Sequence, residues 1–547
     1  NEGDRLMNGI TVTPTPINEP VRLYAPGSPE RDRLAAAIKE MSSKQHDLHM
    51  VINNVKEKGN GPEFIVVSPQ KHQHVLGKSQ SANGADAKRA IDAALAAAKS
   101  WADMSFDDRA AIFLKAADLL AGPWRDRLLA ATVLGQSKTS FQAEIDAACE
   151  LIDFWRFNVH FARQILAEQP ISSPGVWNRT DYRPLEGFVY AITPFNFTAI
   201  AGNLPTAPAL MGNVVIWKPA TTQMLSASLL MDLLIEAGLP AGVINLLPGH
   251  GAEVSEVALN HPDLAGVHFT GSTGVFQHLW QEVGKNISKY KSYPRLVGET
   301  GGKDFVFAHP SADVDVLRTA LIRGAYEYQG QKCSAASRAY VPASLWPSLK
   351  SSLVPAVEAL TMGDPADFKN FMSAVIDAKS FANLKNVIEK SQADPSIEIL
   401  AGGTYDDSVG YFVRPTLITC TDLNHEVFSK EYFGPFLALY VYPDNEYEST
   451  MEQMECNSPY ALTGAFISQD REAISAATTK LRFAAGNYYI NDKPTGAVVG
   501  QQPFGGGRAS GTNDKAGAPQ NLLRWVSARS IKETTVPPTD HHHPHQG

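Results

Sequence analysis

Gly187-Phe188-Val189-Tyr190-Ala191-Ile192 and Asn213-Val214-Val215-Ile216-Trp217-Lys218 are two short apolar runs, each bounded by turn-forming residues. Such runs predict buried strands. A helical pattern follows at residues 226–237 and ends at Gly238-Leu239-Pro240, and residues 243–247 predict a third strand. Because strands and helices alternate, this part of the chain is predicted to fold as a parallel α/β sheet.

The same alternation recurs in the second half of the chain, over residues 303–489. Its clearest strand candidates are Asp304-Phe305-Val306-Phe307, Ser337-Arg338-Ala339-Tyr340-Val341 and Gly464-Ala465-Phe466-Ile467. These runs predict a second layered α/β domain.

Apolar residues at three- and four-residue spacing predict helices over residues 85–98, 106–120 and 142–165, the first opened by Asn83 or Asp86. We expect these helices to pack as one layer. Residues 1–60 mix Pro, Gly and charges without sustained periodicity, which predicts a wrapping arm.

Two polar, extended segments fit neither predicted core. They are residues 171–185 and the chain after residue 520. We expect them to form an edge hairpin that is used in assembly.

Composition restricts the class of protein. With 547 residues, 44% of them hydrophobic, the chain can bury a large core and should contain roughly three folding units at about 150 residues each. The net charge of −9 argues against attraction to nucleic acid or an anionic membrane, and no run of about 18 apolar residues predicts a membrane span. We therefore expect a small-molecule partner.

Four cysteines without paired spacing (Cys149, Cys333, Cys420 and Cys456) indicate neither a disulfide framework nor a zinc cluster, and no metal is expected. A reducing compartment fits best. The chain starts at Asn1 without an apolar signal core, so we expect any targeting peptide to have been removed or to lie outside it. The His-rich residues 541–547 are predicted to be a tail without function.

The surroundings of Cys333 indicate a reactive cysteine rather than a small buried hydrophobe. In Gln329-Gly330-Gln331-Lys332-Cys333-Ser334-Ala335, the Gly permits a close backbone turn and the small residues leave the sulfur reachable. The neighbouring Lys332 is predicted to lower the pKa of the thiol. A thiolate at this position could attack a carbonyl carbon.

With this cysteine motif the chain resembles the aldehyde dehydrogenase superfamily. Gly330-Gln331-Lys332-Cys333 is similar to the nucleophile motif, and Glu299-Thr300-Gly301-Gly302-Lys303 lies 34 residues earlier and is similar to the general-base motif. Pro194-Phe195-Asn196-Phe197 and Trp217-Lys218-Pro219-Ala220 match the family's oxyanion and cofactor-ribose segments. Phe269-Thr270-Gly271-Ser272-Thr273 and Glu431-Tyr432-Phe433-Gly434-Pro435 match two further cofactor segments.

The resemblance implies covalent catalysis by three residues. Cys333 adds to the aldehyde carbon, and the Asn196 amide and the Cys333 backbone N–H stabilise the oxyanion, each such donor being worth about 3 kcal/mol of barrier. Hydride transfer leaves a thioester, and Glu299 activates the water that hydrolyses it.

The resemblance also implies NAD as cofactor, although no Gly-x-Gly-x-x-Gly fingerprint occurs. Thr221 stands where many NAD-specific relatives have Glu, which removes a repulsion against a 2′-phosphate and leaves NADP open. The cofactor-binding residues expected are Thr193, Phe195, Lys218, Ala220, Gly251, Gly271, Ser272, Thr273, Gly274, Val275, Glu431 and Phe433.

Within the superfamily, the chain is most similar to the branch that oxidises glutamate γ-semialdehyde to glutamate in proline catabolism. Runs such as Tyr293-Pro294-Arg295-Leu296-Val297-Gly298-Glu299 and Gly500-Gln501-Gln502-Pro503-Phe504-Gly505-Gly506 are typical of that branch. The substrate-binding residues implied are Glu150, Phe197, Lys332, Ser334, Gly496, Ala497 and Phe504. Some members have Ser at position 497, so Ser334 and backbone amides are expected to compensate here. Glu150 could instead be a solvated helix residue, and Phe504 could only pack.

The implied architecture is an α/β aldehyde dehydrogenase fold with a Rossmann-like cofactor domain, a catalytic domain and a β oligomerisation flap. We place the arm at residues 1–60, the NAD-binding domain at 61–170 and 187–297, the catalytic domain at 298–510, the flap at 171–186 and 511–540 and the tail at 541–547. A homo-oligomer, most simply a homodimer, is expected, together with the mitochondrial matrix and functional coupling to a separate proline dehydrogenase.

Three alternatives remain open on the sequence. The chain could oxidise another small semialdehyde, it could release an acyl-CoA, or it could be a structural protein that keeps the fold. The intact Glu299 argues against the CoA branch, and the presence of Cys333, Glu299 and Asn196 argues against a non-catalytic role.

Overall fold

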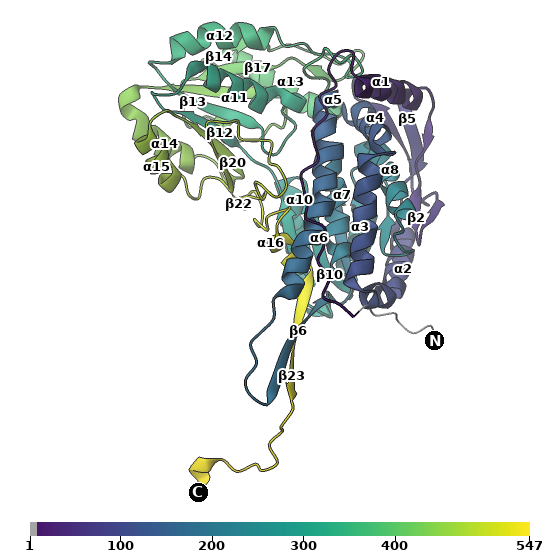
Figure 1. Ribbon diagram of the computed structural model, residues 1–547. Helices are drawn as coiled ribbons and strands as arrows, with labels where there is room; N and C mark the ends of the chain where they lie inside the picture. Colours follow the sequence, from purple (N-terminus) through teal and green to yellow (C-terminus); the bar gives the residue numbers. More distant parts are fainter. Residues whose placement is uncertain (1–7) are drawn as a thin grey trace.

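The computed structural model describes residues 8–547 as two α/β lobes and a two-stranded ribbon that projects away from them (Figure 1). Each lobe is built on a seven-stranded sheet. The predicted fold class, two alternating α/β units, is confirmed.

The first sheet has the strand order β11-β10-β7-β8-β9-β2-β3. The five neighbouring strands from β11 to β9 are parallel, and they are buried along nearly their whole length because helices cover both faces. Register pairs Ile192 with both Phe269 and Lys218, so the strand ends meet at one edge of the sheet. The strands are β7 (Phe188–Thr193), β8 (Val214–Pro219), β9 (Ile244–Leu246), β10 (Leu264–Thr270) and β11 (Arg295–Glu299).

Helices of this lobe follow the predicted pattern with one exception. Asn83 caps the first long helix through a capping box with Asp86, as the sequence predicts. The expected helix over residues 142–165 is instead interrupted by a π-helical turn, η1 (Glu144–Glu150). The helices are α2 (Gly84–Asp103), α3 (Phe106–Ala121), α4 (Arg125–Gln136), α5 (Ser140–Ala143), α6 (Leu151–Ala167), α7 (Thr198–Leu210), α8 (Met224–Glu236), α9 (Ala252–Asn260) and α10 (Thr273–Lys285).

The second sheet has the order β14-β17-β18-β13-β12-β20-β21, with β14 antiparallel to its neighbour and the other strands parallel. Alternate residues of β12 face opposite layers: Phe305 and Phe307 join one hydrophobic cluster, Val306 and Ala308 the other. The strands are β12 (Asp304–Ala308), β13 (Ala336–Pro342), β14 (Ile397–Ala401), β17 (Thr416–Cys420), β18 (Phe436–Tyr442), β20 (Thr463–Ile467) and β21 (Asn487–Ile490).

Helices cover both faces of this second sheet (Figure 1). Buried residues of α11 and α12 belong to the cluster that contains Val306, and those of α13, α14 and α15 belong to the cluster that contains Phe305. The helices are α11 (Val314–Tyr326), α12 (Trp346–Glu358), α13 (Ala378–Ala393), α14 (Tyr447–Cys456) and α15 (Arg471–Lys480).

The N-terminal segment is an arm for only part of its predicted length. Residues 8–28 are extended, whereas α1 (Pro29–Ser42) buries Leu34, Ile38 and Met41, which recur at helical spacing. Beyond it, β2 (Met50–Ile52) and β3 (Val55–Glu57) extend the edge of the first sheet. Residues 29–57 therefore belong to the first lobe rather than to the arm, and residues 1–7 of the predicted arm lie outside the described residues.

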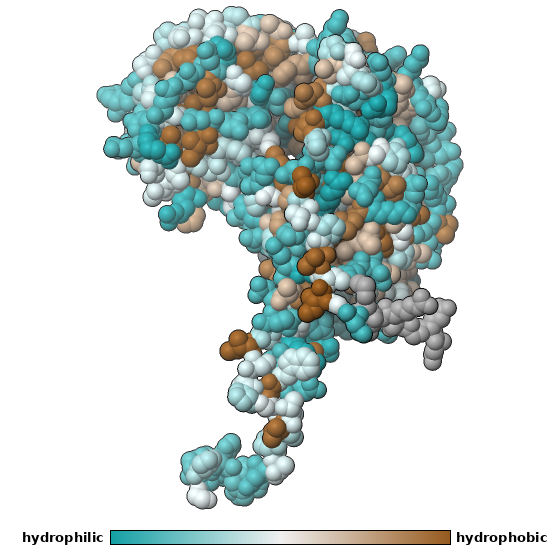
Figure 2. Space-filling view, viewed as in Figure 1, coloured by the Kyte–Doolittle hydropathy of each residue, from teal (hydrophilic) through white to brown (hydrophobic). Residues whose placement is uncertain are grey.

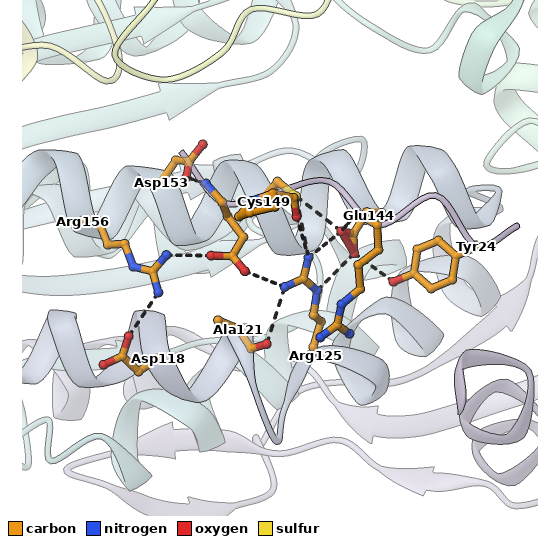
Figure 3. Close-up of polar contacts among 11 residues, drawn as sticks. Tyr24, Asp118, Ala121, Arg125, Glu144, Cys149, Asp153 and Arg156 are labelled. Atoms are coloured by element: carbon orange, nitrogen blue, oxygen red, sulfur yellow. Dashed lines mark hydrogen bonds and ion pairs between the residues drawn. The ribbon is translucent and has the colours of Figure 1, made fainter. Parts of the chain in front are cut away.

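A buried ionic network fastens the arm to the helices (Figure 3). Arg125 of α4 contacts Glu144 at 2.5 Å and Glu19 of the arm at 2.8 Å, and the Tyr24 hydroxyl donates to Glu144 at 2.8 Å. Arg156 of α6 binds the other oxygen of Glu19 at 2.7 Å. Removing one partner of such a buried pair costs about 3–5 kcal/mol, so the arm is an integral part of the lobe.

The ribbon consists of β6 (Val176–Pro184) and β23 (Val526–Thr534), antiparallel over nine residue pairs. The two predicted segments therefore pair, although the strands are distant in sequence and form no hairpin, and their use in assembly stays a prediction. Residues 511–523 depart from the predicted flap, because Gly511 bridges to Glu299 and α16 (Pro519–Leu523) packs on α6. The ribbon is exposed on both sides and carries scattered hydrophobic side chains (Figure 2). Every helix within residues 8–547 is too short or too polar to cross a lipid bilayer.

Candidate active site

Cys333 follows a backbone segment in a strained conformation. After α11, Tyr328, Gln329 and Gly330 have φ values of 50°, 55° and 66°, in the left-handed region that non-glycine residues rarely occupy. A Cβ on Gly330 would lie 2.1 Å from the Gly434 carbonyl oxygen, so only glycine fits there. Such conformations cost about 1–3 kcal/mol each and persist where surrounding contacts impose them.

Buried hydrogen bonds hold this strained segment. The Tyr328 hydroxyl donates to the Gln136 carbonyl at 2.7 Å, and the Gln329 amide donates to the Ser137 carbonyl at 2.9 Å. The Gln331 side chain accepts from the backbone N–H of Ile376 at 2.9 Å. The cysteine loop is thus fixed by contacts from the end of α4 and from the second lobe.

The Cys333 thiol is buried beside carboxylates. Burial raises its pKa well above the ordinary value, and Glu299, Asp304 and Glu431 raise it further. The predicted lowering of this pKa by Lys332 is wrong for this structure. The Lys332 ammonium is itself buried, which lowers its own pKa to about 8, and it lies 3.9 Å from Glu327. The thiol is therefore protonated at neutral pH, and its reaction requires a base.

Asn196 is brought to the cysteine loop by the turn between β7 and α7. Its buried side-chain amide donates to the Gln331 carbonyl at 3.1 Å, two residues before Cys333. A carboxamide nitrogen carries two N–H donors, so a second one remains for another acceptor. The sequence predicted this juxtaposition.

Glu299 lies at the carboxyl end of β11 and is partly buried. Desolvation raises its pKa to about 8, opposed by Lys515 and reinforced by Asp514. The loop after it approaches the nucleophile closely, because a Cβ on Gly302 would lie 2.5 Å from the Cys333 carbonyl oxygen. A base with this pKa is suited to proton transfer near neutral pH.

Glu431 and Phe433 lie on the other side of this loop. The Glu431 carboxylate accepts from the Gly302 backbone N–H at 2.7 Å, and burial raises its pKa to about 7. The Phe433 ring meets the Phe195 ring edge to face at 5.9 Å. Lys303, between them and the sheet, places its ammonium 4.7 Å from the centre of the Tyr432 ring.

The predicted cofactor residues gather at the carboxyl edge of the first sheet. Lys218, at the end of β8, donates to the Pro219 carbonyl at 2.8 Å, and burial lowers its pKa to about 8. Thr193 accepts from the Trp217 indole at 2.9 Å, and its carbonyl accepts from the Ala220 N–H at 3.1 Å. Gly251 lies against Lys218, since an added Cβ would be 3.2 Å from Cε.

The beginning of α10 fits a phosphate-bearing ligand. Ser272 caps this helix by accepting from the Val275 N–H at 3.3 Å, and Gly271 is joined to the Glu299 carbonyl through its N–H at 3.2 Å. Gly274 and Val275 are exposed, with open space where a Gly274 Cβ would be. Free backbone N–H groups in a first helical turn attract anions, so the donor set and the open surface fit a dinucleotide.

The predicted substrate residues fall into two groups. In the first, the Ser334 hydroxyl lies 2.7 Å from the Thr495 hydroxyl, and Gly496 has a φ of 92°. An added Cβ at Gly496 would be 3.5 Å from the Lys493 ammonium, so a cation stands beside this loop and the adjoining Ala497. Phe504 is partly buried and pairs with Ala516 through two backbone hydrogen bonds.

The second group contains Glu150, at the end of η1, and the partly buried Phe197 ring. Burial and the neighbouring Asp146 raise the pKa of Glu150 well above its usual range, and Lys138 opposes this effect. Lys138 and Asp146 are fully buried residues that the sequence analysis missed. No short motif marks them, because their significance arises only when helices that are distant from the cysteine pack around it.

A family model described as the aldehyde dehydrogenase family matches residues 55–531, most of the chain. The chain belongs to the aldehyde dehydrogenase family. A curated relative of this aldehyde dehydrogenase, mitochondrial delta-1-pyrroline-5-carboxylate dehydrogenase from Mus musculus, is 51% identical over 521 residues, which are 95% of this chain and 92% of the relative.

Two solved structures have the same fold as this aldehyde dehydrogenase. Delta-pyrroline-5-carboxylate dehydrogenase from Mycobacterium tuberculosis, bound with NAD, is 59% identical with a TM-score of 0.96, and the match covers 99% of this chain and 100% of that one. Proline utilization A from Bdellovibrio bacteriovorus is 30% identical with a TM-score of 0.89, and the match covers 95% of this chain but 53% of that one.

Proposed function

We propose that this aldehyde dehydrogenase oxidises L-glutamate γ-semialdehyde, the open form of 1-pyrroline-5-carboxylate, to L-glutamate with NAD. The observation that carries the proposal is the convergence of Cys333, Asn196 and Glu299 in a chain 59% identical to a delta-pyrroline-5-carboxylate dehydrogenase bound with NAD. The relatives near 50% identity have the same activity in their names.

In the first step, Cys333 loses its proton and its sulfur bonds to the aldehyde carbon. Because the thiol pKa is raised, a neighbouring base must accept that proton, and Glu299, with a pKa of about 8, can take it. The carbonyl oxygen becomes an oxyanion, which accepts from the free N–H of Asn196 and from the Cys333 backbone N–H. One such donor lowers the barrier by about 3 kcal/mol.

Bound NAD would supply the hydride acceptor. Lys218 and Glu431 are placed to hold its ribose groups, and the first turn of α10 to hold its pyrophosphate. Thr221 stands directly after Ala220 at the start of a short helical turn, where it leaves room for NADP as a slower alternative.

Before the last step, Glu299 must release to solvent the proton that it took from Cys333. It then takes a proton from water as the water oxygen attacks the thioester. The C–S bond breaks, Glu299 returns that proton to the departing sulfur, and the carboxylic acid leaves while Cys333 is restored as a thiol. Lys515 and Asp514 set the pKa of this base in opposite directions.

We assign the selection of an amino-acid aldehyde to the two groups of predicted substrate residues. Ser334, the Gly496 loop and Lys332 would bind the α-carboxylate, with Ala497 contributing only its backbone. Glu150 would bind the α-ammonium, and Phe197 and Phe504 would flank the aliphatic stem. Burial holds the pKa of Glu150 well above its usual range, and binding of the cationic ammonium should lower that pKa and favour the ionised carboxylate.

The domain roles remain part of the proposal. The first lobe would bind NAD, the second would carry Cys333, and the β6–β23 ribbon would pair with a second copy in a homodimer. Coupling to a proline-oxidising partner is supported by proline utilization A, of which this fold spans about half. The mitochondrial matrix agrees with the name of the mouse relative. Mycobacterium has no mitochondria, so the compartment depends on the source cell.

Product analysis tests the proposal. Incubation of the purified protein with NAD and 1-pyrroline-5-carboxylate should yield glutamate and NADH in equal amounts. Parallel reactions with NADP and with no cofactor fix the cofactor preference. NADH formation without glutamate, or no reaction with this substrate while another aldehyde is oxidised, would contradict it.

A further inference from the structure

A fully buried ion pair contacts both the segment that carries Asn196 and the segment that leads to Cys333. Lys138, in the connection between α4 and α5, contacts Asp146 of η1 at 2.6 Å, and both side chains are essentially shielded from solvent. A buried pair of this kind is expensive to desolvate and does not by itself indicate a gain in stability. The contacts that Lys138 and Asp146 make with other segments therefore have to account for the presence of a buried pair here.

Asp146 caps the helix that begins at the predicted oxyanion segment. Its two carboxylate oxygens accept from the backbone N–H groups of Thr198 at 3.0 Å and Ala199 at 2.8 Å, in the first turn of α7. A carboxylate at a helix N-terminus satisfies free N–H groups and is favoured by the helix dipole. Asp146 thus fixes the point at which the chain leaves Asn196 and Phe197.

Lys138 contacts aromatic rings from two catalytic segments. Its ammonium lies 3.9 Å from the centre of the Phe197 ring and 4.6 Å from the centre of the Tyr328 ring. Phe197 adjoins Asn196, and Tyr328 is the first of the strained residues before Cys333. A desolvated cation over an aromatic ring contributes about 2 kcal/mol, so one ammonium joins the two segments.

Neighbouring groups reinforce the same connection. The Gln136 amide donates to the Phe195 carbonyl at 2.8 Å, while its backbone carbonyl accepts from Tyr328. Ser137, with a φ of 54°, presents its carbonyl to Gln329. Residues 136–138 therefore contact the segment that carries Asn196 and the segment that leads to Cys333.

Side chains of the π-helical turn η1 contact two different parts of the protein. Asp146 contacts Lys138 and α7. Glu144 of the same turn instead binds Arg125 and Tyr24 of the arm (Figure 3). π-Helical turns are often found at functional sites. This turn also ends at Glu150, so its placement fixes a predicted substrate residue.

We propose that the Lys138–Asp146 pair is a positioning unit that sets Asn196 and Phe197 relative to Cys333. This inference rests on the proposed function, because it assigns Asn196 to the oxyanion and Phe197 to the substrate stem. Neither member of the pair touches the reacting atoms. Their effect on catalysis passes through the two segments that they join.

Three variants test the pair: Lys138→Met, Asp146→Asn and the double substitution. Turnover is expressed per competent site, counted by stoichiometric alkylation of Cys333, so that a loss of folded protein does not count as a loss of rate. Lys138→Met should lower kcat about 10- to 100-fold, the range that displacement of a catalytic group by about 1 Å produces. The Kd for NAD should stay within twofold, because the contacts of the pair include neither Lys218 nor the first turn of α10.

The double variant should be no slower than the slower single variant, because residues that act as one unit are not additive. Lys138→Arg keeps the charge and should recover part of the rate. Lys56→Met is the matched control, since it removes a 2.6 Å pair with Asp232 at the far edge of the first lobe. That control should stay within twofold of the unsubstituted protein.

The inference is overturned if Lys138→Met keeps kcat per competent site within twofold, or if the two single effects simply multiply. If Lys138→Met does not fold, the test rests on Asp146→Asn, which keeps the side-chain volume and one hydrogen-bond acceptor. A kcat per competent site within twofold of the unsubstituted protein would then overturn the inference. Failure of the proposed function looks different. The unsubstituted protein would then oxidise another aldehyde instead, and the same comparison of variants would be made with that aldehyde.

Discussion

Turnover limited by thioester hydrolysis should rise with pH through a midpoint near 8. Glu299 has a pKa of about 8 because it is desolvated at the end of β11, and only its deprotonated form can activate water. About 9% of the molecules carry this form at pH 7 and about 91% at pH 9, so kcat should rise roughly tenfold between them. The measurement is NADH formation at saturating substrate and NAD between pH 6 and 10.

Substitution of Lys515 distinguishes the titration of Glu299 from that of the Cys333 thiol. Its charge lowers the pKa of Glu299, whereas the groups that perturb Cys333 most are Glu299, Asp304 and Glu431. Lys515→Met should therefore move the midpoint of kcat upward by about one unit, while the pH profile of Cys333 alkylation should move less. Asp514→Asn should move the kcat midpoint downward.

Lys515→Arg is the matched control. The Lys515 ammonium also donates to the carbonyls of Gly486 at 2.9 Å and Gly505 at 3.1 Å, so a neutral variant loses hydrogen bonds as well as charge. The Arg variant keeps a cation and should keep the midpoint near 8. A flat profile between pH 6.5 and 9.5, or a downward shift in Lys515→Met, would refute Glu299 as the base.

Further substitutions probe other parts of the site. Cys333→Ala should abolish turnover and leave the Kd for NAD unchanged, as measured by fluorescence titration; residual steady-state turnover would exclude the covalent route. Asn196→Ala should lower kcat about 100- to 1000-fold through loss of an oxyanion donor, and a change confined to KM would contradict that role. Gly330→Ala should strongly lower the melting temperature and the number of competent sites, because its Cβ would lie 2.1 Å from a carbonyl oxygen, whereas Gly284→Ala, with open space around the same atom, should not.

The fold could be predicted because its signals are local. Buried strands such as β7 and β8 appear as continuous apolar runs, and Asn83 and Asp86 form the capping box that begins α2. The proximity of the three residues proposed for catalysis could be predicted from motifs, since Cys333, Glu299 and Asn196 each lie in a short recognisable segment. They meet at strand ends, because Asn196 follows β7, Glu299 ends β11 and Cys333 precedes β13.

Other features depend on packing between distant segments and leave no local signal. The arm ends at residue 28 rather than 60 because α1 and β2 find partners in the first lobe. The helix expected over residues 142–165 contains a π-helical turn that tertiary contacts of Glu144 and Asp146 impose.

The predicted effect of Lys332 on the pKa of Cys333 was wrong for a related reason. Adjacency in sequence suggested that its charge would lower the Cys333 pKa, but its ammonium lies toward Glu327, and carboxylates surround the thiol. The sign of a pKa shift follows from burial and from the charges that face the group. Neither is readable from neighbouring residues in the chain.

The ratio of kcat/KM values among aldehydes tests the central claim most directly. The purified protein would be assayed with NAD and glutamate γ-semialdehyde, succinic semialdehyde or propanal under one set of conditions. Because Ser334, the Gly496 loop and Glu150 are assigned to the amino-acid end of the substrate, kcat/KM should be far higher for glutamate γ-semialdehyde than for the other two. Equal values for all three would contradict the assignment.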